Sequence, residues 1–192
     1  MKFLVTGLLG LASFLTAASQ SLTTTVPLPV DSATHLVTYK GGANPDHSAQ
    51  ELFNRAVEWL DTAFRYGTSE IRVADVQAGK IVSRQTIQVL TSGGDSYDVT
   101  CTLVMLIQGG YKYKFTNIYF DRIGTGIPVV HVEDLMYATK KQYVIWAGLG
   151  YMGGATKLVD ALLKPMDGYL RQMEASLNNS MTRDTSGDKN TW

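Results

Sequence analysis

The sequence predicts an α+β protein built on an antiparallel sheet of about five strands. Two segments, residues 48–65 and 158–177, have the apolar periodicity of helices, and four strand-like runs follow one another between residues 71 and 123. The gaps between these runs are short, whereas parallel strands need crossovers of a dozen or more residues. We therefore expect an antiparallel meander in the element order β-α-β-β-β-β-α.

The length and composition are those of one ordinary globular domain. The chain has 192 residues, of which 45% are hydrophobic and 18% are charged. This is enough for one core and leaves little room for a second. We expect an extended leader at 20–33, a single α+β domain at 34–178 and a disordered polar tail at 179–192.

The first residues have the pattern of a secretory signal peptide. Lys2 precedes an apolar run that ends near Leu15, and small residues follow at 17–19. The run is shorter than the roughly 20 apolar residues that span a membrane. We expect residues 1–19 to be removed on export, leaving a periplasmic or secreted chain without a transmembrane segment. Because no cysteine lies near the cleavage region, the mature protein is expected to be soluble rather than a lipoprotein.

The domain begins with a short strand and the clearest helix signal in the chain. Residues 35–39 predict the first strand, and the glycine-rich residues 41–45 are expected to end it. Ser48 and Glu51 form a capping box, and apolar residues recur at i, i+3 and i+4 beyond it. The spacing predicts a helix over 48–65, with its charged side in solvent.

Two strands, at 71–76 and 81–90, precede a long hairpin at 97–123 that turns at Gly109-Gly110. A two-residue turn would pair residues whose numbers sum to 219. One face would then be core, with lysines and Thr116 toward the turn: Val99, Cys101, Leu103, Met105, Ile107, Lys112, Lys114, Ile118 and Phe120. The other face would be amphipathic: Thr100, Thr102, Val104, Leu106, Tyr111, Tyr113, Phe115, Asn117 and Tyr119.

The tyrosines of this second face suit either a half-covered sheet face or a binding surface, because tyrosine combines a large apolar body with a polar tip. Tyr111, Tyr113 and Tyr119 are therefore candidate binding residues. Trp146 and Tyr151, on a glycine-rich connector, are added to them. A long amphipathic helix follows over 158–177, kinked or restarted at Pro165.

Motifs for cofactors and metals are weak. Gly148, Gly150 and Gly153 match G-x-G-x-x-G, but no second parallel strand with a terminal acidic residue follows, so no cofactor is expected. The three histidines are scattered and Cys101 is the only cysteine, so neither a metal site nor an intramolecular disulfide is expected.

One cluster keeps an enzymatic alternative open. His131 lies beside Glu133 and Asp134, which would suit a general base with its orienting group or a pair of metal ligands. Such triplets also arise by chance in polar links, and no catalytic residue is assigned.

Several segments together resemble a bacterial family of secreted proteins described as a domain of unknown function with a TBP-like fold. They are VPLPVD, ELFNRAVEWL, GKIVSRQ, GGYKYKFTNIYF and the terminal helix, and they extend over about Val26 to Leu177. The resemblance implies an antiparallel sheet with two helices on one face. Its motifs identify the fold and carry no catalytic residue.

The function expected from these observations is that of an exported, non-enzymatic envelope binding domain that uses the tyrosine-rich face. Its partner would be an envelope protein or a small ligand. The alternative is a small secreted hydrolase-type enzyme built on His131, Glu133 and Asp134. Attachment to a membrane surface or partner through apolar residues 143–155 is a third possibility. Loss of residues 1–19 leaves 16 basic against 17 acidic residues, so nucleic acid is not an expected partner.

Overall fold

The computed structural model describes residues 25–64, 67–90, 94, 96–121, 129–137 and 155–183. The predicted signal peptide, the front of the leader, Trp146, Tyr151 and the glycine motif at 148–153 lie outside these residues. None of the helices in the described ranges is long and apolar enough to cross a membrane.

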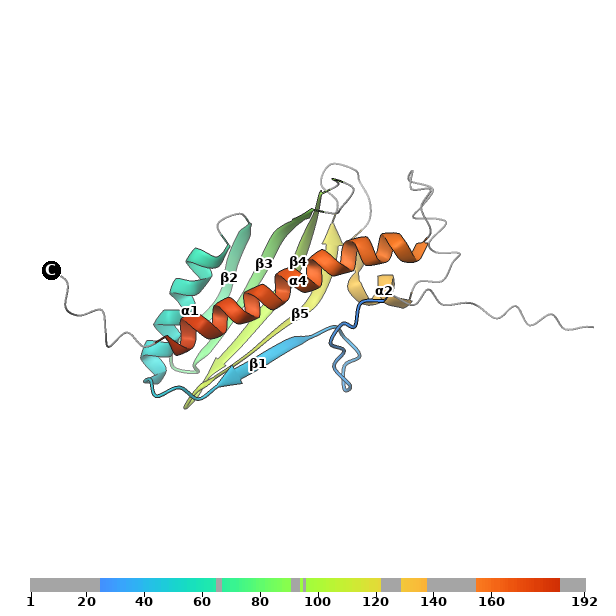
Figure 1. Ribbon diagram of the computed structural model, residues 1–192. Coiled ribbons are helices and arrows are strands. Elements are labelled where there is room, and N and C mark those ends of the chain that lie inside the picture. The colour runs from blue at the N-terminus through green and yellow to red at the C-terminus, as the bar shows by residue number, and fades with distance from the viewer. Residues whose placement is uncertain are drawn as a thin grey trace, which may run out of the picture.

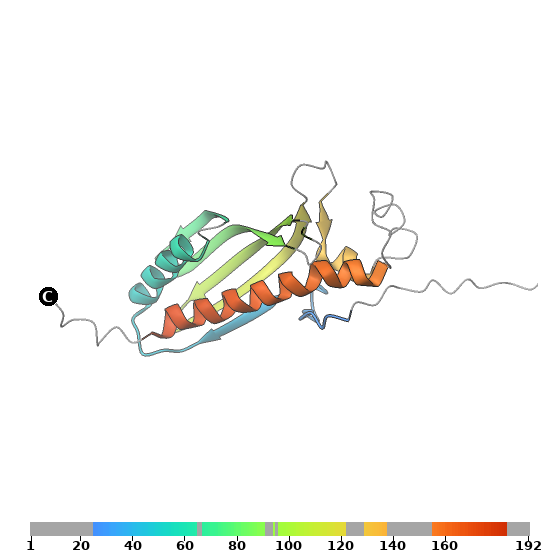
Figure 2. The ribbon, with the colours of Figure 1, turned by 45° about the horizontal axis from the view of Figure 1, so that its top comes forward.

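The sheet is antiparallel, and its strands lie in the order β1-β5-β4-β3-β2. They are β1 (Tyr39–Ala43), β2 (Thr68–Asp75), β3 (Lys80–Leu90), β4 (Ser96–Ile107) and β5 (Tyr111–Asp121), and the two-residue β6 (Val130–His131) pairs with β5. The helices are α1 (Ala49–Ala63), α2 (Val132–Tyr137) and α4 (Ala155–Thr182). Both long helices cross the same side of the sheet (Figures 1 and 2). The predicted α+β class, with an antiparallel sheet and two main helices on one face, is confirmed.

Helix α1 forms where the capping box predicts it. The Ser48 hydroxyl accepts a hydrogen bond from the Glu51 backbone N–H at 3.2 Å, which satisfies one of the unpaired amides at the helix start. Its buried face includes Trp59 and Leu60. The Trp59 indole N–H donates to Ser176 of α4 at 3.1 Å, so the two helices are joined directly.

Three boundaries differ from the sequence-based expectation. Strand β1 begins at Tyr39 and runs through the glycines that were expected to break it. Helix α4 is continuous through Pro165 and ends at Thr182, so residues 179–182 are helical and are not part of a disordered tail. Val26 and Leu28 of the expected leader are buried against the core.

The connection between β4 and β5 has three residues rather than two. Ile107 pairs with Tyr111, and paired residue numbers sum to 218 as far as Thr102 and Thr116. Beyond that point a β-bulge adds one residue to β5, and Thr100 pairs with Tyr119. Asn117 adopts φ 53° at the bulge, a left-handed conformation that asparagine tolerates better than most residues. The predicted faces are therefore wrong for β5 before the bulge and right after it.

The core lies between the sheet and the two long helices. Cys101 is buried there among aliphatic neighbours, and burial raises the pKa of its thiol to about 12. The inner face carries these buried residues of the three central strands: Ile81, Ile87, Val89, Val99, Leu103, Met105, Ile107, Tyr111, Tyr113, Phe115, Ile118 and Phe120. Each large apolar side chain buried in this way contributes about 1.5–3 kcal/mol.

Candidate binding face of the sheet

Two of the predicted binding tyrosines belong to the core. Tyr111 and Tyr113 are 1% and 5% exposed. The three-residue turn places them on the helix side of β5, opposite Ile107 and Met105. The prediction that they share a bare face with Tyr119 is wrong, because it assumed a two-residue turn, and a shift of one residue exchanges the two faces of a strand.

The hydroxyls of these two tyrosines attach β5 to α4. Tyr111 donates to Asn178 Oδ1 at 2.8 Å, and the Asn178 amide donates to Tyr113 Oη at 3.2 Å. Tyr113 in turn donates to Glu174 Oε1 at 3.4 Å. Burial, reinforced by the nearby Glu174 carboxylate, raises the pKa of Tyr113 to about 12. Burial also raises the pKa of Glu174. These contacts have a structural role.

Tyr119 is the described tyrosine of the predicted set that lies on the uncovered face. The bulge turns it away from the helices, where it is partly exposed. The Arg84 guanidinium lies 5.7 Å from the centre of its ring and hydrogen-bonds to its hydroxyl. The centre of the His131 ring, on the neighbouring strand β6, lies 5.7 Å from the centre of the Tyr119 ring.

The proposed catalytic trio is not assembled in this structure. The Glu133 carboxylate accepts a hydrogen bond from the Val37 backbone N–H at 2.6 Å and so holds the N-terminal segment. His131 contacts Tyr119 instead. Across the described ranges, no hydrogen bond or ion pair joins His131 to Glu133 or Asp134, and no group of three metal-ligating side chains occurs.

A cleft of about 630 Å³ lies between α1 and the C-terminal end of α4. Arg55 crosses it and donates to the backbone carbonyls of Ser180, at 3.4 Å, and of Arg183. Because its polar groups close the end of a helix, this cleft is a structural junction.

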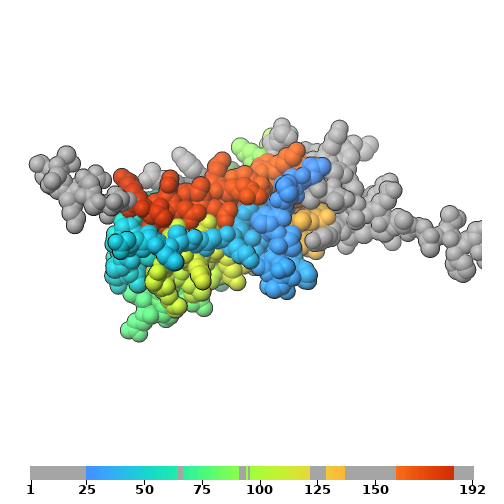
Figure 3. Space-filling view, turned by 60° about the horizontal axis from the view of Figure 1, so that its bottom comes forward, coloured from blue at the N-terminus to red at the C-terminus, as the bar shows by residue number. Residues whose placement is uncertain are grey.

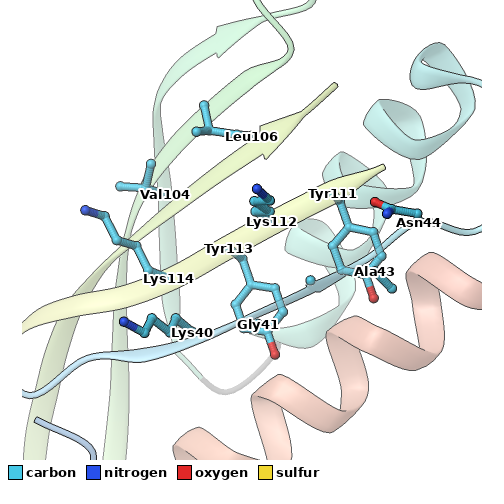
Figure 4. Close-up of a pocket in the computed structure, with 11 residues that line it drawn as sticks. Lys40, Gly41, Ala43, Asn44, Val104, Leu106, Tyr111, Lys112, Tyr113 and Lys114 are labelled. Atoms are coloured by element: carbon cyan, nitrogen blue, oxygen red, sulfur yellow. The ribbon is translucent and has the colours of Figure 1, made fainter. Parts of the chain in front are cut away.

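The uncovered face holds a groove of about 540 Å³ over β1, β5 and β4. We call it the lysine groove. It is lined by Lys40, Gly42, Val104, Leu106, Lys112 and Lys114, among others. Figure 4 shows the side chains of Lys112 and Lys114 on the opposite side of β5 from the tyrosine rings, which point toward a helix. In the space-filling view, α4 lies along one side of β1 and the surface of β5 lies open on the other (Figure 3).

The charged side chains that line the groove are all positive. Among its lining residues, all of which the structure describes, there are three lysines and no acidic side chain. Lys40 forms an ion pair with Asp31 at 2.9 Å. Lys112 and Lys114 are exposed, and neither has an ion-pair partner within the described part of the chain.

The sequence contained one signal for this groove. In YKYKF, lysine and aromatic residues alternate, and lysine is almost never buried without a partner. The lysines of β5 therefore mark its solvent face and the aromatic residues mark the core. The contribution of Lys40 and Gly42 could not be found in this way, because it depends on the pairing of β1 with β5 over more than 60 residues of chain.

Comparisons with known proteins agree with this fold. Residues 43–121 match the family described as "Domain of unknown function (DUF4468) with TBP-like fold". The crystal structure of a DUF4468 family protein from Bacteroides ovatus ATCC 8483 is similar, with a TM-score of 0.61 and 13% identity, over 82% of this chain and 92% of that chain.

A TBP-like protein from Parabacteroides distasonis ATCC 8503 has a TM-score of 0.51 and 12% identity, over 75% of this chain and 94% of that chain. The comparison with curated proteins found no match. At these identities the two structures show the fold alone. The resemblance to the DUF4468 family with its TBP-like fold is thus confirmed, and residues 43–121 carry it.

Proposed function

We propose that this protein is an exported, non-enzymatic binding domain whose uncovered sheet face takes a negatively charged ligand in the lysine groove. The observation that carries the proposal is the combination of three lysines, the aliphatic side chains of Val104 and Leu106, and no acidic residue around the described groove. Its volume lies within the roughly 300–1,000 Å³ of typical ligand pockets. A groove lined by lysines favours ligands that carry negative charge.

Export is part of the proposal and rests on residues 1–19. Their single lysine, short apolar run and small residues have the pattern of a cleaved secretory signal. The mature chain would then be periplasmic or secreted and would meet an envelope protein or a small ligand. Its formal charge of −1, from 16 basic and 17 acidic residues, does not favour nucleic acid as the ligand.

A binding role without catalysis is supported by the contacts of the groove and of the former catalytic candidates. The groove presents ammonium groups and aliphatic side chains, which attract and position an anion but provide no base. Glu133, one of the three residues of the enzymatic alternative, accepts a hydrogen bond from the Val37 backbone N–H.

The experiment is an NMR titration of the ¹⁵N-labelled protein with a panel of anions at constant ionic strength. The panel contains glucose 6-phosphate, a sulfated disaccharide, a glutamate-rich peptide and a fatty-acid anion. For at least one member we expect the amide signals of Val104, Leu106, Lys112 and Lys114 to shift. Lys112→Glu should abolish these shifts, whereas Lys164→Glu, on the exposed surface of α4, makes the same change in charge and should leave them intact.

The proposal would be contradicted if no anion shifted the groove signals. It would also be contradicted if Lys164→Glu weakened binding as much as Lys112→Glu did. That second result would mean that the net charge of the protein, and not the groove, attracts the ligand.

A further inference from the structure

The uncovered face separates charge from apolar surface along a single row of residues. Successive strand pairings place Lys40 beside Lys114, Lys114 beside Val104, Val104 beside Val82, and Val82 beside Val73. The row therefore crosses all five long strands. Two cations lie over β1 and β5, and three valines lie over β4, β3 and β2.

The apolar half of this row is open to solvent. Val73 is 40% exposed, and Leu106, beside the row on β4, is 44% exposed. Val82 and Val104 are half-buried, and both long helices pack on the other side of the sheet. From β5 to β2 there are three strand spacings, or about 14 Å. The uncovered face thus offers a narrow apolar track that begins at the lysines.

Charged rows border this track on both sides. One neighbouring row contains Arg84 paired with Glu70. The other contains Lys112 and Lys80 on either side of Leu106, with Asp75 beyond Lys80. The three valines therefore form a narrow strip, widened only at β4 by Leu106, which has the shape of an extended hydrocarbon chain and not of a broad hydrophobic patch.

We propose that the lysine groove and the valine row bind one molecule of an anionic amphiphile. Its acidic head contacts Lys114, Lys112 and Lys40, and its hydrocarbon tail lies along Val104, Val82 and Val73. This inference rests on the proposed function and names the chemical class of its ligand.

The arrangement favours this ligand over two others. An acidic peptide would carry charges along its length, whereas the cations beside the middle of the track, Arg84 and Lys80, each stand opposite an acidic residue of β2, Glu70 and Asp75. The lysines without an acidic strand partner, Lys112 and Lys114, lie at one end of the track. A bilayer surface would need a wide apolar area for insertion, whereas Lys80 and Arg84 on either side of Val82 keep this apolar strip narrow. A groove of about 540 Å³ also matches a single small molecule.

The experiment is isothermal titration of the full-length purified protein with dodecanoate below its micelle-forming concentration. Acetate supplies the head without the tail, and dodecyl maltoside supplies the tail without the charge. We expect dodecanoate to bind at least tenfold more tightly than either. In parallel, sedimentation with vesicles of phosphatidylglycerol tests the bilayer, and the glutamate-rich peptide tests the acidic chain.

Three variants and two matched controls locate the contacts. Lys114→Glu should weaken dodecanoate binding more than tenfold, and Lys114→Gln should weaken it by less. Val82→Asn should weaken it about tenfold, because the tail loses roughly the apolar contact of one side chain. The matched controls are Lys164→Glu and Leu90→Asn. Leu90 is 64% exposed at the far end of β3, and neither control should change binding.

Each other outcome overturns the inference. If acetate bound as tightly as dodecanoate, the hydrocarbon tail would not contribute to binding. If dodecyl maltoside did, the negative charge of the head would not contribute. Sedimentation with vesicles without binding of monomeric dodecanoate would make the face a membrane contact. If the peptide binds in the groove and dodecanoate does not, this inference fails while the proposed function stands. If no anion binds in the groove, both fail. Circular dichroism of each variant establishes that a loss of binding is not a loss of fold.

Discussion

Replacement of Gly41 by alanine tests how closely β1 approaches the core face of β5. Gly41 pairs with Tyr113, whose ring lies across it on its way to α4. A Cβ atom at position 41 would lie 2.6 Å from the Tyr113 hydroxyl oxygen and 2.8 Å from Cζ. Both distances are shorter than any ordinary van der Waals contact, so the ring must move.

The substitution is expected to be destabilising because the Tyr113 ring has no free space into which it could move. Tyr113 is 5% exposed and is fixed at its tip by Asn178 and Glu174, so a displaced ring strains the core or loses those hydrogen bonds. Overpacking of this kind costs about 1–3 kcal/mol, and each lost hydrogen bond costs about 1 kcal/mol. We expect Gly41→Ala to lower the free energy of unfolding by about 2–3 kcal/mol.

The assay is a double-mutant cycle measured by urea unfolding. Leucine at position 113 lacks the hydroxyl oxygen, Cζ and Cε1, the three atoms that the new methyl group would meet. In the Tyr113→Leu background, Gly41→Ala should therefore cost nearly nothing, or stabilise the strand by up to about 1 kcal/mol. Gly168→Ala is the control, since its added Cβ meets no atom within 4 Å, and helix propensity predicts about 1 kcal/mol of stabilisation. An equal cost of Gly41→Ala in both backgrounds would refute the proposed contact.

Three further predictions concern the helix junction, alkaline stability and export. Arg55→Ala removes a buried donor to the carbonyls of Ser180 and Arg183, so it should cost about 1–3 kcal/mol and speed amide hydrogen exchange in the last turn of α4; unchanged exchange there would contradict this role. The pKa of Tyr113 is raised from 10.0 to about 12, so the folded state retains a proton that the unfolded state loses. The unfolding free energy should fall between about pH 10 and pH 12, and Tyr113→Phe should make this fall shallower in pH-dependent urea unfolding. Mass spectrometry of the exported protein should find Gln20 at or near its N-terminus; retention of residues 1–19 would refute cleavage.

The two long helices could be predicted from the sequence, whereas the pairing register of the hairpin could not. The capping box at Ser48 and the apolar periodicity of the two helices are local signals, and both helices are present. The choice between a two-residue and a three-residue turn at Gly109-Gly110 is not local, because glycines fit both. That choice decided the face of Tyr111 and Tyr113, and with it the predicted site.

The lysine groove illustrates the same limit for function. Lys112 and Lys114 could have been assigned to solvent from their alternation with aromatic residues. Their position beside Lys40 and ahead of the valines of β3 and β2 depends on strand pairings between distant segments. The sequence therefore contained the components of the site without their arrangement.

The bulge at Asn117 reverses which alternate residues of β5 face the helices. Before it, odd-numbered residues face the helices; after it, even-numbered ones do. Deletion of the exposed Asn117 would give both halves of β5 the same alternation. Either Ile118 and Phe120, or Tyr113 and Phe115, would then face water. A gap here should accordingly be far rarer among relatives than a substitution, and an alignment that slides past this position by one residue would exchange interior for exterior along half the strand.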